Sequence, residues 1–261
     1  MSKFLSIFIC FFNIIFSENN TYILIHGTWA QEAGWYRESG DFFDTLSCVI
    51  DKTDEIISFS WSGECFESAR RVAAIALVKL LEKEQKKNKK IVIIAHSHGG
   101  NVVLHALSYM QQHCVKIFID AVFLLGTPIF HNYESKIFAV HVLINIFSFG
   151  DFIQPVFGLF KRIIPENKNI INISIAITGK EPAHNQLYHP LLAYYIPELL
   201  KKFKTMDHDY KKLYELNLQH HTPPEISEKN YEKRLLEDQL FHEYLLSHLL
   251  WGPEEALYFL P

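Results

Sequence analysis

The chain has 261 residues, of which 49% are hydrophobic and 21% are charged, and its formal net charge is −4 at neutral pH. This length and apolar content are sufficient for one sizeable buried core, so we expect one globular domain followed by a tail. The negative charge gives no electrostatic basis for nucleic-acid binding. The sequence has no internal repeat or low-complexity segment, which excludes repeat architectures and compositionally biased disorder.

Residues 1–17 differ in composition from the rest of the chain. One positive charge, at Lys3, precedes a short apolar run that ends at Ser17. This pattern is typical of a secretory signal peptide, so we expect export, either secreted, periplasmic or membrane-associated. The run is too short to cross a bilayer of about 30 Å comfortably, and Ile15 stands where a cleavage site usually has a small residue. The alternatives are an uncleaved membrane anchor, with contact to a membrane surface, and an apolar N-terminal extension without either role.

The cysteines do not identify the redox compartment. Cleavage after Ser17 would remove Cys10 and leave Cys48, Cys65 and Cys114. Three cysteines cannot form a complete disulfide framework, so the disulfide state is left open.

Residues 21–29 contain the first strand-like segment, which ends at His26-Gly27 and continues into Thr28 and Trp29. Glycine at this point allows the chain to turn sharply. It also allows the following backbone N–H groups to approach a bound ligand closely.

Further apolar runs recur along the chain, and helical patterns separate several of them. The strand-like runs cover 54–60, 91–95, 121–126, 142–148 and 172–178, and the helical patterns cover 66–87, 98–112 and 190–204. Strands that alternate with helices pair in parallel, because a parallel connection requires a crossover. We therefore expect an α/β fold with a mostly parallel open sheet and helices on both faces. Ligands in such sheets bind beyond the carboxyl ends of the strands.

Residues 91–100 place a serine at the end of an apolar strand and at the start of a helix. Ala95 and Gly99 lie two positions before and after Ser97. A nucleophile on a sharp strand-to-helix turn leaves no room for larger side chains at these two positions. The first N–H groups of the following helix also favour a developing negative charge. Ser97 is therefore the candidate nucleophile.

This segment resembles the nucleophile elbow of α/β-hydrolases, G-x-S-x-G, with Ala95 in place of the first glycine. The sequence Leu-Leu-Gly-Thr-Pro at 124–128 is similar to the strand that follows the nucleophile in lipases and esterases. The resemblance, which is to a group of lipase-related bacterial hydrolases, covers about residues 20–204. It implies the α/β-hydrolase fold.

The resemblance also implies an oxyanion hole. In α/β-hydrolases one backbone N–H comes from the loop after an early strand, and the other comes from the residue after the nucleophile. In this sequence the donors would be the N–H of Thr28 or Trp29 and the N–H of His98.

A serine hydroxyl near neutral pH requires a histidine base and a carboxylate that orients the base. In α/β-hydrolases these partners follow the serine in the order acid, then histidine, each just past a later strand. This order points to Asp151 and His184. Asp120 precedes its strand and Glu134 lies one strand too early, so both are weaker candidates for the acid. His189 is the rival base, although its position before a proline is typical of the start of a helix.

Residues 205–261 fall outside the resemblance. Pro223-Pro224 breaks helical structure, and residues 225–248 have a charged helical pattern. We expect a helical C-terminal tail that packs on the domain, with a cap over the pocket or a partner surface as the alternatives. The apolar segment 152–164, directly after the proposed acid, is a second candidate lid. The predicted organisation is a signal peptide or anchor over 1–17, an α/β-hydrolase domain over 18–204 and a helical extension over 205–261.

Together these features predict a serine hydrolase that cleaves carboxylic esters, with a small or lipid-like acyl ester as its substrate and with no cofactor. We predict no metal, because the 14 histidines form no ligand pattern. A thioesterase, an amidase or an acyltransferase would use the same triad of Ser97, Asp151 and His184, so these activities are alternatives. A catalytically inactive binding protein on the same fold is the non-enzymatic alternative. The oligomeric state is left open.

Overall fold

The computed structural model describes residues 19–129, 139–158, 161–165, 167–205 and 213–249. Within these ranges eight strands form one sheet, in the order β2-β1-β3-β4-β5-β6-β7-β8. All neighbouring strands are parallel except β7 and β8. The strands are β1 (Asn20–Ile25), β2 (Glu55–Phe59), β3 (Lys90–His96), β4 (Ile119–Leu125), β5 (Val140–Phe147), β6 (Ile170–Ile177), β7 (Leu213–Leu218) and β8 (Glu225–Lys229).

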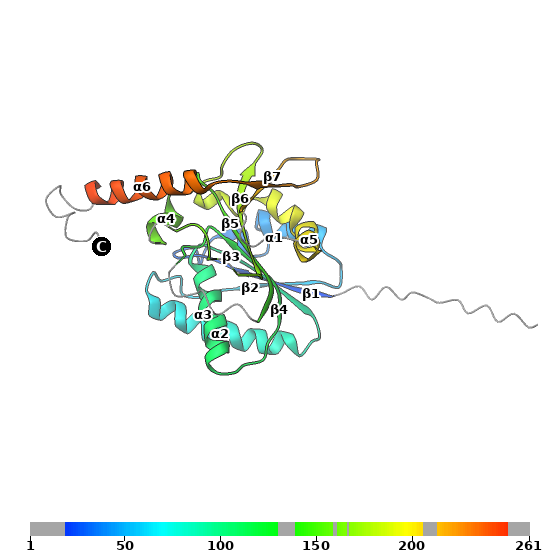
Figure 1. The fold of residues 1–261 in the computed structure, drawn as a ribbon. Coiled ribbons are helices and arrows are strands. Elements are labelled where there is room, and N and C mark those ends of the chain that lie inside the picture. The colour runs from blue at the N-terminus through cyan, green and yellow to red at the C-terminus, as the bar shows by residue number, and fades with distance from the viewer. Residues whose placement is uncertain (1–18, 130–138, 159–160, 166, 206–212, 250–261) are drawn as a thin grey trace, which may run out of the picture.

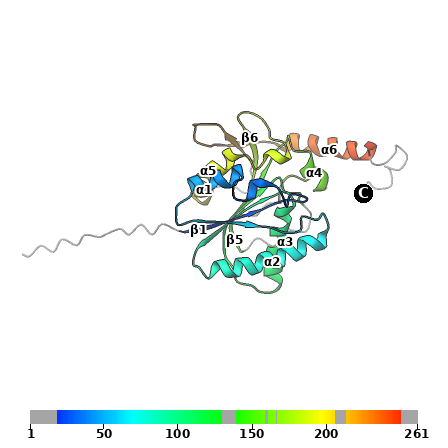
Figure 2. The same ribbon diagram turned by 180° about the vertical axis from the view of Figure 1, so that it is seen from behind.

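Helices cover both faces of this sheet (Figure 1). The α-helices are α1 (Asp41–Val49), α2 (Glu67–Gln85), α3 (His98–Gln112), α4 (Ile153–Phe157), α5 (Pro190–Thr205) and α6 (Glu232–Leu249). Two short 3₁₀ helices, η1 (Gly34–Tyr36) and η2 (His184–Gln186), lie in loops. The helices α2 and α3 lie on one face and α1 and α5 on the other, as the view from behind also shows (Figure 2).

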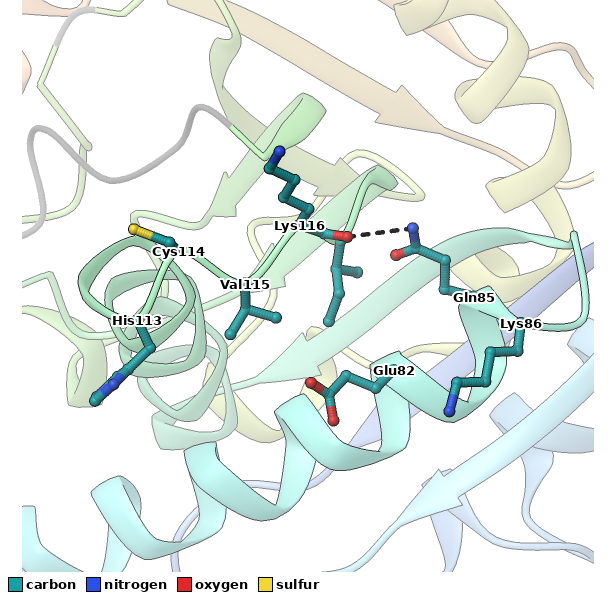
Figure 3. A pocket seen from close by; sticks show the side chains of 8 residues that line it. Glu82, Gln85, Lys86, His113, Cys114, Val115 and Lys116 are labelled. Atoms are coloured by element: carbon teal, nitrogen blue, oxygen red, sulfur yellow. Dashed lines mark hydrogen bonds between the residues drawn. The ribbon is translucent and has the colours of Figure 1, made fainter.

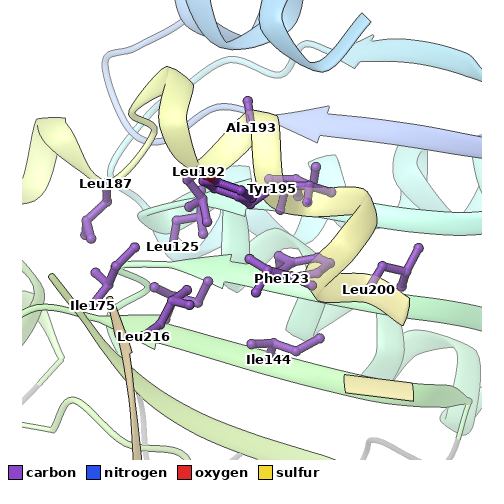
Figure 4. Close-up of a cluster of buried hydrophobic side chains, with 14 of the residues drawn as sticks. Phe123, Leu125, Ile144, Ile175, Leu187, Leu192, Ala193, Tyr195, Leu200 and Leu216 are labelled. Atoms are coloured by element: carbon purple, nitrogen blue, oxygen red, sulfur yellow. The ribbon is translucent and has the colours of Figure 1, made fainter. Parts of the chain in front are cut away.

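Two buried apolar clusters hold these layers together. Successive side chains of a strand point to opposite faces, so Leu24 packs in the cluster with α1 and α5, whereas its neighbour Ile23 packs in the cluster with α2 and α3. Figure 4 shows part of the first cluster, in which Leu192 of α5 lies above Leu125 and Phe123 of β4. Because both faces of the central strands are covered, these strands are mostly apolar rather than alternating.

The strand order changes direction beside β1. The strand β2 pairs with one side of β1, and β3 pairs with the other. The helices that follow β1 and β3 lie on opposite faces of the sheet. In open α/β sheets such a switch point forms a crevice at the carboxyl ends of the two strands. His26-Gly27 follows β1 and Ser97 follows β3, so both lie at this crevice. The expected fold class is confirmed: the chain has an α/β-hydrolase fold.

The tail differs from its expectation in one respect. Residues 213–229 form two strands, because β7 pairs in parallel with β6 and β8 pairs antiparallel with β7. The predicted helix over 225–248 is therefore wrong at its start, and α6 begins at Glu232. Sheet pairing overrides the local helical pattern of the charged segment 225–229. The sheet thus extends into the segment that the resemblance did not cover.

Residues 1–17, with Cys10 and the expected signal peptide or anchor, lie outside the described residues. Cys48, Cys65 and Cys114 are exposed free thiols. Within the described ranges, every helix is too short or too polar to span a bilayer.

Candidate active site

Ser97 occupies a strained turn between β3 and α3. Its backbone has φ 53° and ψ −133°, in the left-handed half of conformational space that non-glycine residues rarely adopt. A side chain at Gly27 would place its Cβ 2.8 Å from the Cβ of Ser97, and a side chain at Gly99 would place its Cβ 2.5 Å from the carbonyl oxygen of His26. The loops after β1 and β3 therefore touch, and only small residues fit between them.

Asp151 and His184 are in direct contact. Asp151 follows β5, and its buried carboxylate accepts hydrogen bonds from the backbone N–H groups of Ile153 and Gln154 at 2.8 and 3.0 Å through Oδ1. Its Oδ2 lies 2.7 Å from Nδ1 of His184, the first residue of η2 after β6. Because the carboxylate accepts, Nδ1 carries the hydrogen, and Nε2 of His184 is left as an acceptor.

Ser97 lies next to this pair across the end of β4. The N–H of Ser97 donates to the carbonyl of Leu125 at 2.9 Å. The following residue, Gly126, has φ 57°, and a Cβ there would lie 2.9 Å from Oδ2 of Asp151 and 3.3 Å from Nδ1 of His184. In the described part of the chain no hydrogen bond joins the Ser97 hydroxyl to His184. Such bonds are often long before substrate binds.

The loop after β1 narrows the choice of oxyanion donors. The N–H of Trp29 donates to the carbonyl of Gly63 at 2.8 Å and is therefore already used. Of the two expected alternatives, Thr28 is the one that the geometry favours. His98 is the first residue of α3, where backbone N–H groups have no acceptor within the helix.

Sequence reasoning did not assign a role to the ring of His26. Nδ1 of His26 lies 2.8 Å from the carbonyl oxygen of Gly27, and Nε2 accepts the N–H of Trp61 at 3.2 Å. The indole of Trp61 donates back to the carbonyl of His26 at 2.8 Å. This buried ring thus holds the loop after β1 against the loop after β2. No pattern in the sequence marks this contact, because it depends on how the two loops meet in space.

The rival residues have other roles. Asp120 is the second residue of β4, at the opposite end of the strand from the crevice, and it pairs with Lys204 at 2.8 Å. Nδ1 of His189 accepts the N–H of Leu191 at 3.0 Å at the start of α5, so the expected place at the start of a helix is confirmed. Glu134 lies outside the described residues.

Burial keeps three histidines around the site neutral. Burial lowers the pKa of His96 to about 3, with a further contribution from the nearby charge of His184. Burial also lowers the pKa of His98 to about 4, helped by the positive charge of Arg70. The pKa of His26 is lowered as well, mainly by burial. These rings are therefore uncharged at neutral pH and act through shape and hydrogen bonds.

An apolar rim formed by α4 and the residue before it lies beside the crevice. Phe152, Ile153, Val156 and Phe157 are all more than a third exposed. The ring of Phe157 lies edge-on to the ring of His98, with 5.7 Å between the ring centres. The expected candidate lid thus begins with an apolar helix that faces the residue after Ser97.

The C-terminal helix α6 contacts both loops that carry the acid and the base. Arg234 of α6 pairs with Glu181 at 2.6 Å, three residues before His184, and its guanidinium lies 3.9 Å from the ring centre of Phe149, two residues before Asp151. The helix therefore lies against the acid loop and the base loop at once.

A separate pocket opens at the other end of the sheet, between the last turn of α2 and the loop after α3 (Figure 3). It is lined by Glu82, Gln85, Lys86, His113, Cys114, Val115, Lys116 and Ile117. None of the predicted site residues lies in it. Among the described residues no group of three or more His, Cys, Asp or Glu side chains is arranged to hold a metal ion, and the absence of a metal stays a prediction.

Comparisons with known proteins found one family model and several solved structures that match part of the chain. Residues 46–170 match a family described as a protein of unknown function (DUF726), and no curated protein matches the sequence. A Trichoderma reesei cutinase with a bound phosphonate inhibitor is 23% identical over 44% of this chain, with a TM-score of 0.32, and the match spans 53% of that cutinase.

Two further solved structures align over more of the chain. A cutinase-like protein from Cryptococcus sp. is 12% identical over 71% of this chain and 92% of its own, with a TM-score of 0.41. An arylesterase is 13% identical over 72% of this chain and 77% of its own, with a TM-score of 0.42. Because these identities and TM-scores are low, the fold assignment rests on the strand order of the chain itself and not on the alignments.

Proposed function

We propose that the protein is a serine hydrolase that cleaves carboxylic esters. The single observation that carries the proposal is the 2.7 Å hydrogen bond between Asp151 and His184, next to a serine in a strained strand-to-helix turn. A carboxylate that fixes the Nδ1–H tautomer of a histidine leaves Nε2 free to accept a proton from a nucleophile. A sharp turn that costs on the order of 1–3 kcal/mol is retained where function requires it.

The proposed reaction has two stages. Oγ of Ser97 attacks the ester carbonyl carbon, and Nε2 of His184 takes the hydroxyl proton. The backbone N–H groups of His98 and Thr28 hold the oxyanion of the tetrahedral intermediate. The intermediate collapses, and the alcohol leaves with the proton from His184. Water then attacks the acyl-enzyme by the same route, which releases the carboxylic acid and restores Ser97.

The proposed substrate is a small or lipid-like acyl ester. The exposed apolar side chains of α4 and the edge-on contact between Phe157 and His98 support an apolar acyl site beside the oxyanion donors. Thioesters, amides or transfer to another acceptor alcohol would require the same groups. The proposal also includes export, or contact with a membrane surface, because residues 1–17 have the pattern of a signal peptide or anchor.

Labelling with a fluorophosphonate probe tests the proposal. The wild-type protein is expected to be labelled at Ser97, and Ser97→Ala is expected to lose labelling and to hydrolyse p-nitrophenyl butyrate about 10⁴- to 10⁶-fold more slowly. Ser62→Ala, at an exposed serine of the neighbouring loop, is the matched control and should be labelled normally. Hydrolysis by Ser97→Ala at the wild-type rate would contradict the proposal. Faster cleavage of anilides than of the matching esters would favour the amidase alternative.

A further inference from the structure

We propose that His96 is a positioning residue for His184: it holds the base by its backbone carbonyl, so that the ring stays between Asp151 and Ser97. The inference rests on the proposed function, because it assigns a role relative to the same nucleophile and base. His96 is the residue immediately before Ser97.

One hydrogen bond defines the contact. Nε2 of His96 lies 2.9 Å from the backbone carbonyl oxygen of His184. A carbonyl oxygen only accepts, so Nε2 of His96 carries the hydrogen and donates. The same carbonyl accepts a longer hydrogen bond, of 3.4 Å, from the N–H of Leu187. His96 therefore supplies the shorter of these two bonds.

This bond joins segments that are not neighbours in the sheet. His96 ends β3, whereas His184 follows β6, and β4 and β5 lie between these strands. Asp151 holds the ring of His184 through Nδ1, and His96 holds its main chain. The base is thus fixed at two points, one of which is directly bonded in the chain to the nucleophile. A displacement of about 1 Å between reacting groups is sufficient to slow an enzyme by about 10²-fold.

The surroundings of His96 suit a donor and exclude a base. Its ring is 5% exposed and packs edge-on against Trp35 and Tyr188, with ring centres 6.1 and 4.9 Å away. Within the described residues its Nδ1 is buried without a hydrogen-bond partner. The ring centre of His96 lies 4.6 Å from that of His184. A neutral His96 adds no positive charge beside His184 when that residue takes up a proton, and burial keeps the pKa of His96 at about 3.

A pair of substitutions of equal length tests the hydrogen bond. The amide nitrogen of His96→Gln reaches about as far as Nε2 and still donates, whereas His96→Met has a similar size and no donor. We expect the Gln variant to keep kcat for p-nitrophenyl butyrate within about fivefold of wild type, and the Met variant to lose about 10- to 100-fold in kcat with an unchanged KM. The rate of fluorophosphonate labelling should fall in parallel, and the melting temperature shows whether each variant folds.

Three outcomes separate the two proposals. Wild-type protein that resists labelling at Ser97 contradicts the proposed function itself. Labelled wild type with equal kcat in the Gln and Met variants contradicts only the role of His96. If the Met variant does not fold, His96→Asn replaces it, because the asparagine amide is too short to reach the carbonyl of His184. A lower kcat in the Asn variant than in the Gln variant supports the proposal, and equal kcat values overturn it.

Discussion

Arg162 and Asp238 are 76 residues apart and form a two-pronged ion pair. Nε and Nη2 of Arg162 donate to the two carboxylate oxygens of Asp238 at 2.6 and 3.0 Å. The side chain of Arg162 is fully buried, and that of Asp238 is 13% exposed. The remaining nitrogen, Nη1, donates to the carbonyl of Ser148 at 2.7 Å, three residues before Asp151. The pair therefore joins α6 to the loop that carries the proposed acid.

We expect Asp238→Ala to destabilise the fold strongly. The substitution leaves a buried guanidinium without its counter-charge, which typically costs about 3–5 kcal/mol. Urea unfolding measures this loss as a change in the free energy of unfolding. Glu237→Ala is the matched control, because Glu237 is 62% exposed and pairs with the 89% exposed Lys233 at 3.6 Å, and such surface pairs contribute about 0–1 kcal/mol. Equal losses of unfolding free energy in the two variants would show that the buried pair stabilises the fold no more than the surface pair does.

We expect substitution of His184 to abolish activity and substitution of His189 to affect mainly stability. His184→Ala should reduce kcat/KM for p-nitrophenyl butyrate about as much as Ser97→Ala, by about 10⁴-fold or more. His189→Ala removes an acceptor for the N–H of Leu191 at the start of α5, so we expect a loss of stability of about 1 kcal/mol and a substantial residual activity. Steady-state kinetics and thermal unfolding of both variants check this, and the reverse ranking of activities would move the base to His189.

The apolar rim predicts a dependence on acyl chain length. A methylene that is buried in the transition state contributes about 0.8 kcal/mol, which corresponds to about fourfold in kcat/KM. We expect kcat/KM to rise from p-nitrophenyl acetate to the butyrate. Phe157→Ala should flatten this series, whereas Phe118→Ala, an exposed phenylalanine at the opposite end of the sheet, should leave it unchanged. A flat series in the wild-type protein would contradict the lipid-like substrate and leave the serine mechanism intact.

Acid should destabilise the fold through His98. Burial lowers the pKa of this ring to about 4 in the folded protein, against about 6.5 in an unfolded chain. The unfolded state therefore binds the proton first, so the stabilising effect of a neutral His98 is complete above about pH 6.5 and declines as the pH falls toward 4. The slope is about 1.4 kcal/mol per pH unit.

The substitution His98→Asn measures this contribution. Asparagine retains an acceptor near the position of Nδ1, which accepts from the side-chain amide of Asn101 at 3.0 Å. The free energy of unfolding of His98→Asn should change less between pH 7 and pH 5 than that of wild type, by about 1–2 kcal/mol. If the free energy of unfolding changes equally in the variant and in wild type between pH 7 and pH 5, burial does not lower the pKa of His98.

The sequence alone was sufficient for the strands as far as β6, although it missed the helices α1 and α4, and the reason is local. Each strand to that point is an apolar run with a clear boundary, and the helix over 98–112 has the same limits in the structure. The strand β7 alternates buried and partly exposed residues, with Tyr214, Leu216 and Leu218 on the inner side. Six alternating residues inside a polar tail are a weak signal for a strand. These residues become a strand because they pair with β6.

The predicted site residues were accessible from the sequence for a different reason. Ser97 stands out by its small neighbours, and Asp151 and His184 stand out by their order after later strands. Hydrogen bonds that reach the carbonyl of a distant loop have no such pattern. The hydrogen bond from Trp29 to Gly63 and the bond from His96 to the carbonyl of His184 depend on how the loops meet in space, so the sequence could not predict either.

The placement of β7 beside β6 limits how far the chain can be shortened. If the protein ended at residue 204, where the resemblance stops, β6 would become an edge strand with a row of unpaired backbone groups. Its inner face would also lose Leu216 and Leu218, which are fully buried. Because β6 leads to His184, fraying at that new border would reach the base. The last quarter of the chain is thus not a detachable module, and loss of catalysis after its removal would report on the integrity of the sheet rather than on chemistry performed by the tail.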